Sequence, residues 1–428
     1  MSSPNYQLPI TNSILGKIRA LVFKPRTVLV VYIALAIGVA LQLISIGSHV
    51  FVLPGQGFHR NDIIFKPELL NLFIGTHQTD YNNYLVFKYS WFHLINGTNL
   101  YGVYPTEHWD FYKYSPTFAL FMGLLAYLPD IVGLSLWNLL NVITLFFAIR
   151  MLPFSVKTQC ILLWFMAFEM LTSIQNSQSN CLMGGLIILA YGCMQQQKIL
   201  LATLWLVVAT YIKVYGAIGF CLFLFYPGKL KFVLYATLWT VVLAALPLCV
   251  TTYSNLVQQY HNWADLLRAD ATAATGISVA GWLNKWFGFS NIRGYVTVTG
   301  LVLFLLPLVR FGLYRNEVFK LLMLAFMLIW VIIFNHKAES PTYIIAVAGV
   351  GIWYFALPKA AWRTGLLWLV FIFTSLSATD IFPRYIRMHF IYPYAIKAVP
   401  CILVWCVVLI ELMLLKKEQK MAQDAITG

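Results

Sequence analysis

The sequence predicts an all-α polytopic membrane protein that forms one integrated domain over residues 1–428. Of these residues, 60% are hydrophobic and only 10% are charged, whereas a typical soluble domain carries about 25% charged residues. The hydrophobic residues also gather in a long series of runs that short polar segments separate. Both features are typical of chains that cross a bilayer many times.

The apolar runs predict about twelve membrane-spanning helices. A helix needs about 20 apolar residues to cross the bilayer, and several runs are shorter than that. The first run is too long for the apolar part of a cleavable signal peptide, so we expect it to be retained as an anchor. The runs lie near 27–50, 131–152, 158–176, 181–196, 199–212, 214–227, 230–251, 296–314, 317–335, 342–357, 364–379 and 397–415.

The basic residues predict the orientation of the chain. With the N-terminus in the cytoplasm, most of the 29 Lys and Arg residues fall in cytoplasmic segments, as the positive-inside rule requires. The net charge of +14 is then a topology signal, and we expect membrane lipids and no nucleic acid as partners. We therefore expect a multi-pass protein of the cell (plasma or inner) membrane, with both termini, including the tail 416–428, in the cytoplasm.

Residues 51–130 form the predicted first extracytoplasmic loop. Within the loop, residues 80–95 carry apolar side chains at helical spacing, and residues 116–129 are apolar but too few to cross the bilayer. Counting 116–129 as a span would move the later basic loops outside. We therefore expect two juxtamembrane helices on the outer membrane face, joined by 97–115. Long structured loops of this kind usually carry function.

The unusual polar side chains converge on the outer side in this topology. They come from the first loop, from the joints after 176 and 212, from 336–341 and from the last outer loop. An ionisable group costs roughly 2.5–3.5 kcal/mol at the centre of a spanning helix, so such groups are functional candidates. Glu169 lies inside a span, where we expect a hydrogen bond between helices.

The chemistry of these residues suits transfer from a lipid-linked donor. The sequence has no Gly-rich phosphate loop, no H-E-x-x-H and no G-x-S-x-G, and nucleotide sugars are absent outside the cell. A carboxylate can deprotonate a hydroxyl, cations can hold a lipid phosphate, and aromatic rings suit sugars. The phosphate candidates are Lys213, Lys337, Arg384 and Arg387, and the substrate candidates are His77, Tyr81, Tyr114, Gln178, Asn180, His336 and Glu339.

Each candidate also has a structural interpretation. Asp80 and the pair Gln178 and Asn180 are suited to helix caps. Lys213 is suited to snorkelling from a span end. The arginines are suited to interface anchors, and 336–339 to a local salt-bridged loop.

Several ordered motifs resemble glycosyltransferase family 87 of the GT-C superfamily, whose members include polyprenyl-phosphate-dependent mannosyl- and arabinofuranosyltransferases. One span precedes a long outer loop with an early Asp, and the later motifs follow in the family's order. Gly216 departs from the pattern because it stands where the family usually has Pro. The motifs are Gly97-x-x-Leu100-Tyr101, Tyr114-Ser115-Pro116-Thr117-Phe118-Ala119-Leu120, Leu128-Pro129 with Trp137, Asn176-Ser177-Gln178-Ser179-Asn180, Lys213-Val214-Tyr215-Gly216 and His336-Lys337-Ala338-Glu339-Ser340-Pro341-Thr342-Tyr343.

The resemblance implies a GT-C-type bundle and an inverting transfer of a hexose or pentose. It assigns the catalytic base to the first outer acidic residue, Asp80. The donor would be a polyprenyl-phosphate sugar, and the acceptor a hydroxyl of a lipid or glycan. We expect no cofactor, and no metal because no second carboxylate neighbours Asp80 in the sequence.

Two other functions fit a chain of this kind. A transporter or flippase of lipid-linked sugars would show a polar path along its spans and repeated halves, and neither is evident. An envelope polysaccharide polymerase or ligase would rely on a large late outer loop rich in Arg and His. Here the major polar loop is the first one, and 252–295 carries two arginines and one histidine.

Overall fold

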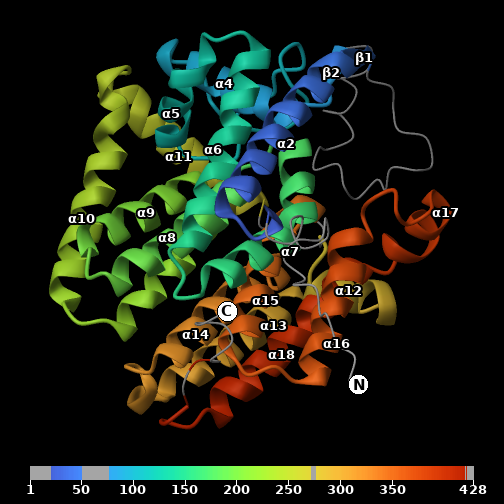
Figure 1. The fold of residues 1–428 in the computed structure, drawn as a ribbon. Coiled ribbons are helices and arrows are strands. Elements are labelled where there is room, and N and C mark those ends of the chain that lie inside the picture. The colour runs from blue at the N-terminus through green and yellow to red at the C-terminus, as the bar shows by residue number, and fades with distance from the viewer. Residues whose placement is uncertain (1–20, 51–76, 271–275, 420, 422–428) are drawn as a thin grey trace, which may run out of the picture.

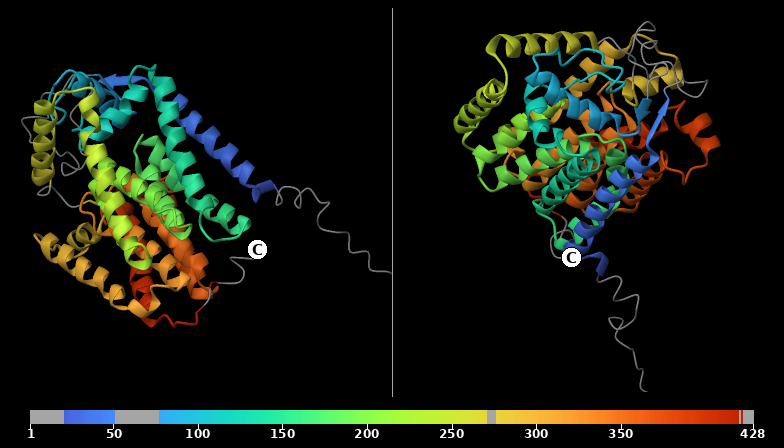
Figure 2. Two further views of the ribbon diagram at one scale, coloured as in Figure 1. Left: turned by 90° about the vertical axis from the view of Figure 1, so that its left-hand side faces the viewer. Right: turned by 90° about the horizontal axis from the view of Figure 1, so that it is seen from above.

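The fold is a helical bundle, shown in Figure 1 as a computed structural model that describes residues 21–50, 77–270, 276–419 and 421. Within these ranges the strands are β1 (Ser48–Val50) and β2 (His77–Thr79), which pair antiparallel. Helix α2 lies at the edge of the bundle against α6 and α7 (Figures 1 and 2). The predicted all-helical class is confirmed.

Each of the twelve predicted spans overlaps a helix, but the first, predicted over 27–50, ends at Ile46 because Ser48–Val50 form β1. In the described part of the chain, four helical segments are long and apolar enough to cross a membrane: Pro25–Ile46, Asp130–Arg150, Lys229–Cys249 and Ile396–Leu414. The number of crossings stays a prediction. The twelve are α2 (Pro25–Ile46), α6 (Asp130–Arg150), α7 (Val156–Gln175), α8 (Asn180–Gln195), α9 (Ile199–Ile212), η3 (Val214–Phe225), α10 (Lys229–Ala245) with η4 (Leu246–Cys249), α13 (Arg293–Leu305) with η5 (Leu306–Val309), α14 (Glu317–Ile333), α15 (Tyr343–Ala356), α16 (Ala361–Val370) with η8 (Phe371–Leu376), and α18 (Val399–Leu414).

Helices α14 and α15 form the centre of the bundle. Nearly every side chain on both helices is buried, including the large Trp353. A helix that is apolar all round has no face suited to water and is therefore buried. Helices α7, α8 and α18 pack around this centre.

The ends of the helices fall into two groups. At one end, Arg363 forms an ion pair with Glu411 at 2.7 Å, Arg310 donates to the Leu415 carbonyl oxygen at 2.8 Å, and Arg150 contacts Gln159. This is the end that the positive-inside rule assigns to the cytoplasm. The turn 176–180, Lys213 and the loop 336–339 gather at the other end.

The segment η3 is a 3₁₀ helix of 12 residues. Its buried residues are Gly216, Gly219, Leu222 and Phe225, which recur every third residue, the period of a 3₁₀ helix. A Cβ at Gly216 would lie 2.7 Å from the Ala209 carbonyl carbon, so only glycine permits this approach to α9. At about 2.0 Å per residue the segment covers roughly 24 Å, which explains how so short an apolar run reaches across the bundle.

The two predicted juxtamembrane helices are α4 (Asn82–Ile95) and α5 (Pro116–Ala126). The Ser115 hydroxyl caps α5 by accepting from Phe118 N–H, and Pro116 occupies the first turn. Helix α5 ends three residues earlier than expected because the residue before Pro129 disfavours helical geometry. The 11 residues of α5 extend about 16 Å, which is too short to cross the bilayer.

Residues 252–295, which the sequence led us to expect as a loop, contain two further helices. Helix α11 (Tyr253–Asp270) packs on the first loop, and α12 (Val279–Phe287) is capped by the Ser278 hydroxyl. The apolar residues of α11 are dilute, but Leu256, Tyr260, Trp263 and Leu267 recur at helical spacing. The remaining short elements are η6 (Phe311–Leu313), η7 (Ser340–Thr342), α17 (Arg384–Ile386), η9 (Arg387–Ile391) and η10 (Ile396–Ala398).

Gln259 attaches α11 to the first loop, and its loss should destabilise the protein. Its side chain accepts from Leu100 N–H at 3.0 Å and donates to the Thr98 carbonyl oxygen at 2.9 Å. Gln259→Leu leaves the Leu100 N–H buried without its partner, so we expect the free energy of unfolding to fall by about 1–3 kcal/mol. Thermal unfolding in detergent measures this. Gln258→Leu, at an exposed neighbouring position, should change stability little, and equal losses in both variants would contradict the assignment.

Candidate functional site

The turn between α7 and α8 is the centre of the candidate site. Ser177 adopts a left-handed backbone conformation with φ of 51°, which is uncommon for a residue other than glycine. The indole N–H of Trp137 donates to the Ser177 carbonyl oxygen at 2.9 Å. Asn180 begins α8 and is fully buried. The turn thus carries polar groups into the packed end of the bundle.

A chain of hydrogen bonds connects this turn to a cation and to an anion. Lys213 Nζ donates to Asn180 Oδ1 at 2.8 Å, and Asn180 Nδ2 donates to Gln178 Oε1 at 2.6 Å. Gln178 Nε2 then donates to Glu339 Oε2 at 2.7 Å. We call these four residues the Lys213–Glu339 network. Each amide accepts on the lysine side and donates on the carboxylate side, so the dipoles are aligned between the two charges.

Lys213 is the cation of this network. It has extended backbone between α9 and η3, and its Nζ lies 5.8 Å from the ring centroids of both Tyr114 and Tyr215. Burial lowers the pKa of Lys213 to about 8, and the nearby Glu339 opposes that shift. At neutral pH the side chain is therefore mostly an ammonium group in a partly desolvated aromatic setting, where it is suited to an anionic ligand.

The first loop forms an aromatic wall beside Lys213. The Tyr101 hydroxyl donates to the Tyr114 carbonyl oxygen at 2.9 Å, and the Tyr114 ring packs edge-on against Phe87. Burial raises the pKa of Tyr114, so its hydroxyl stays protonated at neutral pH. The Ser115 hydroxyl donates to the Tyr211 carbonyl oxygen at 2.6 Å, which joins the wall to α9.

Asp80 lies in the turn between β2 and α4, and it is exposed. The N-cap position of α4 is Tyr81 rather than Asp80, so capping does not account for the aspartate. One turn further along, Asn83 Nδ2 donates to the Asn176 carbonyl oxygen at 2.9 Å. The segment that carries Asp80 therefore lies against the α7–α8 turn.

The loop 336–339 supplies Glu339, and a second segment holds it in place. The Gly276 N–H donates to the His336 carbonyl oxygen at 2.6 Å, and the Ile277 N–H donates to the Ala338 carbonyl oxygen at 2.8 Å. A Cβ at Gly276 would lie 2.4 Å from the Ala338 carbonyl oxygen, so glycine is required here. His336 and Lys337 are half-buried in the same loop.

Five predicted residues thus meet at one end of the bundle: Tyr114, Gln178, Asn180, Lys213 and Glu339. Tyr215 joins them through a 3.3 Å contact with Asn180 Oδ1. Tyr215 was not among our candidates, although its place two residues after a lysine at a span end is a usable signal. The capping interpretation of Gln178 and Asn180 does not describe their side chains, which bond to each other and to charged groups.

Tyr81, Arg384 and Arg387 lie apart from this network. The Tyr81 hydroxyl donates to Asp130 Oδ2 at 3.2 Å, beside the Lys88–Asp130 ion pair, so it fastens α4 to α6. Arg387 forms an ion pair with Asp380 at 2.6 Å, and Arg384 begins α17 and is exposed. His77 contributes backbone to β2, and its side chain lies outside the described residues.

Glu169 accepts the expected hydrogen bond, and because its donor is Lys397 Nζ at 2.6 Å, the contact is also an ion pair. The pair does join two helical segments, as predicted, because Glu169 lies on α7 and Lys397 on η10. Elsewhere in the described ranges, no group of three or more His, Cys, Asp or Glu side chains is arranged to hold a metal ion.

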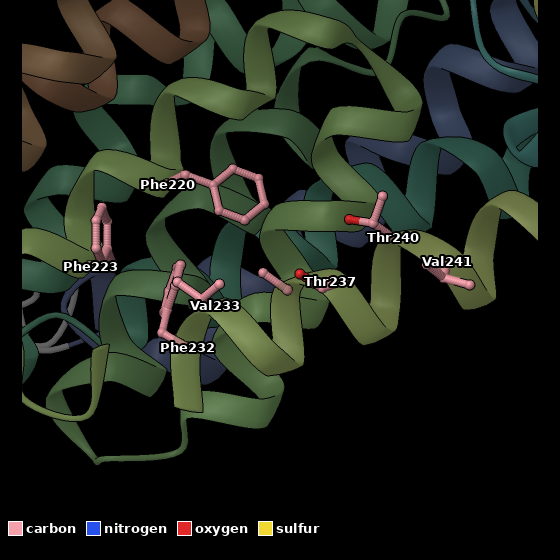
Figure 3. A pocket seen from close by; sticks show the side chains of 8 residues that line it. Phe220, Phe223, Phe232, Val233, Thr237, Thr240 and Val241 are labelled. Carbon is pink, nitrogen blue, oxygen red and sulfur yellow. The ribbon is translucent and has the colours of Figure 1, made fainter. Parts of the chain in front are cut away.

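An apolar groove runs along the outer surface of η3 and α10 (Figure 3). It has a volume of about 340 Å³ and is lined mainly by aromatic and aliphatic side chains. One end of the groove reaches Thr240, whose carbonyl oxygen accepts from the Tyr211 hydroxyl at 2.9 Å. The groove therefore adjoins the residue that also anchors Ser115. The lining residues are Phe220, Phe223, Phe232, Val233, Ala236, Thr237, Thr240 and Val241.

A comparison with protein families identifies the family of the chain. The family model of glycosyltransferase family 87 matches residues 111–376, which is more than half of the 428 residues. The matched stretch includes the whole Lys213–Glu339 network, but Asp80, Arg384 and Arg387 lie outside it. A search of curated proteins found no match. The chain belongs to glycosyltransferase family 87, a family of membrane glycosyltransferases.

Proposed function

We propose that this glycosyltransferase moves a hexose or pentose from a polyprenyl-phosphate-linked donor to a hydroxyl of a lipid or glycan acceptor. The observation that carries the proposal is the half-buried Lys213, held in an aromatic setting at one end of an apolar bundle. Such a cation is suited to an anionic headgroup that arrives from the membrane. A soluble nucleotide donor would require a phosphate loop, which the sequence lacks.

The reaction proceeds with inversion at the anomeric carbon. The Asp80 carboxylate takes the proton of the acceptor hydroxyl, and the oxygen attacks the anomeric carbon. The bond from that carbon to the phosphate oxygen breaks, and polyprenyl phosphate leaves with the electron pair. Lys213 and Lys337 stabilise the developing phosphate charge. Exposure of Asp80 and the contact of its segment with the α7–α8 turn support its role.

The remaining candidates take supporting roles in this proposal. We assign sugar contacts to Tyr114, Gln178, Asn180, His336 and Glu339, whose polar and aromatic groups suit a pyranose or furanose ring. Arg384 and Arg387 are assigned to binding the phosphate headgroup of the donor. His77 and Tyr81 flank Asp80 in the sequence and are assigned to the acceptor.

The groove between η3 and α10 suits the prenyl chain of the donor. It is apolar and open toward the lipid-facing surface of α10, most of whose side chains are exposed. Its Thr240 end adjoins Tyr211, two residues before Lys213. A chain in the groove would leave its phosphate near that lysine. We place the reaction on the extracytoplasmic side of the cell membrane, opposite the end that gathers Arg150, Arg310 and Arg363.

A transporter of lipid-linked sugars is less well supported. Its substrate path would need polar groups along the depth of the bundle. The polar groups of the Lys213–Glu339 network instead gather at one end, while α14 and α15 fill the centre with apolar side chains.

Asp80→Asn should abolish most of the transfer. Removing a general base lowers kcat by about 10²–10⁴-fold, while the amide keeps the size of the side chain. Initial rates of sugar transfer from polyprenyl-phosphate donors to membrane acceptors measure this. Asp265→Asn is the matched control, because Asp265 is an exposed carboxylate on α11. Full activity of the Asp80 variant would exclude the residue as the base.

Donor binding should depend on the protonation of Lys213. Because burial lowers its pKa to about 8, the ammonium form is lost as the pH rises through that value. We expect the KM for the donor to rise up to about tenfold per pH unit above pH 8. Lys213→Arg keeps its charge at all these pH values and should flatten the profile, measured between pH 6.5 and 9.5. The same rise in the arginine variant would show that another group titrates.

Filling the groove should affect long-chain donors selectively. Val233→Trp places an indole among the lining residues, whereas Leu234→Trp changes the next, similarly exposed residue of α10 outside the lining. We expect the first variant to raise the KM for long polyprenyl donors about tenfold and to leave short-chain donors unaffected. The second should match wild type with both donors. Equal behaviour of the two variants would rule out the groove as the prenyl site.

A further inference from the structure

A buried ion pair lies away from the Lys213–Glu339 network. Glu169 Oε1 and Lys397 Nζ are 2.6 Å apart, and their side chains are 0% and 3% exposed. Charged groups at such depth in a membrane bundle are expensive and usually functional. Replacing a buried pair with apolar residues is often neutral or stabilising, so stability alone does not account for it.

The lysine side of the pair connects to the loop of Glu339. Lys397 Nζ lies 5.5 Å from the ring centroid of Tyr343, the first residue of α15. The Tyr343 hydroxyl donates to the Ile277 carbonyl oxygen at 2.8 Å. Ile277 in turn donates to the Ala338 carbonyl oxygen, next to Glu339. Lys397 therefore supports, through one aromatic ring, the segment that fixes the loop 336–339.

The glutamate side connects to the α7–α8 turn. Glu169 lies on α7, which ends at Gln175 just before the turn of Gln178. Helix α7 itself packs against η7, which directly follows Glu339. Helices α7 and α15 lie side by side in Figure 1, as their contacts require. The ion pair therefore connects the elements beneath two segments, the α7–α8 turn and the loop 336–339. These are the segments that the Gln178–Glu339 hydrogen bond joins.

Both segments that carry the pair adjoin a strained turn. Ser177 follows α7 with φ of 51°, and Ala395 precedes Lys397 with φ of 48°. Left-handed backbone at residues other than glycine costs energy and persists where the surroundings enforce it. The ion pair is a suitable enforcing contact, because its two groups accept only a narrow range of separations.

We infer that Glu169 and Lys397 are positioning residues, which hold the Gln178–Asn180 turn and the loop 336–339 at the separation that the transfer reaction requires. They touch neither donor nor acceptor, and they act through Tyr343 and through α7. The inference rests on the proposed function for its kinetic consequence. Its structural consequence, the fixing of the loop against 276–277, is independent of any activity.

The test replaces both charges at once, because a single variant would leave a buried charge and risk misfolding. In the double variant Glu169→Leu, Lys397→Met we expect thermal stability close to wild type. The kcat for sugar transfer should fall about tenfold to a hundredfold, since small misplacements of reacting groups have effects of that size. The KM for the donor should change less than threefold. Hydrogen exchange at the amides of Gly276 and Ile277 should accelerate at least tenfold.

The matched control is the double variant Arg363→Met, Glu411→Leu, which removes the part-buried ion pair at the opposite end of the bundle. It should leave kcat and exchange at 276–277 at wild-type values. Equal kinetic losses in both double variants, or unchanged exchange in the Glu169–Lys397 variant, would overturn the positioning role. A wild-type protein that transfers no sugar from polyprenyl donors would refute the proposed function, while the exchange measurement would still decide this inference.

Discussion

A bundle of apolar helices has no water with which to satisfy its polar groups, so every amide and charge inside it must find a partner within the chain. The Lys213–Glu339 network meets this requirement across segments that lie far apart in the sequence. Its two carboxamides transmit hydrogen bonds from an ammonium group to a carboxylate, and no donor faces another donor. The requirement also places the network where helices end, because only there do side chains leave the packed centre.

The helices and their order were largely predictable from the sequence, since apolar runs record where a chain is surrounded by lipid or by other helices. The short run 116–129 does form a helix, α5, whose 11 residues are too few to cross the bilayer, while its position on the membrane face stays a prediction. Helix α11 was missed because its apolar residues are dilute, and α12 because its 9 residues make too short an apolar run to stand out. In α11 the few apolar residues signal a helix by their spacing along the chain rather than by their number.

The candidate site was predictable only in its composition. Gln178 and Glu339 stand 161 positions apart, and nothing in either segment specifies the other. Tyr81 shows the converse, because it directly follows Asp80 in the sequence, whereas its hydroxyl donates to Asp130. The family match covers the phosphate candidate Lys213 but begins after Asp80, so the two assignments rest on different grounds.

The three-residue period of η3 has a consequence for how this protein can vary. Each face of a 3₁₀ helix repeats after three residues, so Gly216 and Gly219 touch α9 while Phe220 and Phe223 line the groove. Inserting or deleting one residue between Lys213 and Gly216 would rotate all later side chains by about 120°. A deletion would bring Phe220 to the place of Gly219 against α9, and an insertion would bring Ile218 there, where only a hydrogen atom fits. Changes of length in this segment are therefore tolerable in steps of three, whereas point substitutions on the groove face are comparatively free.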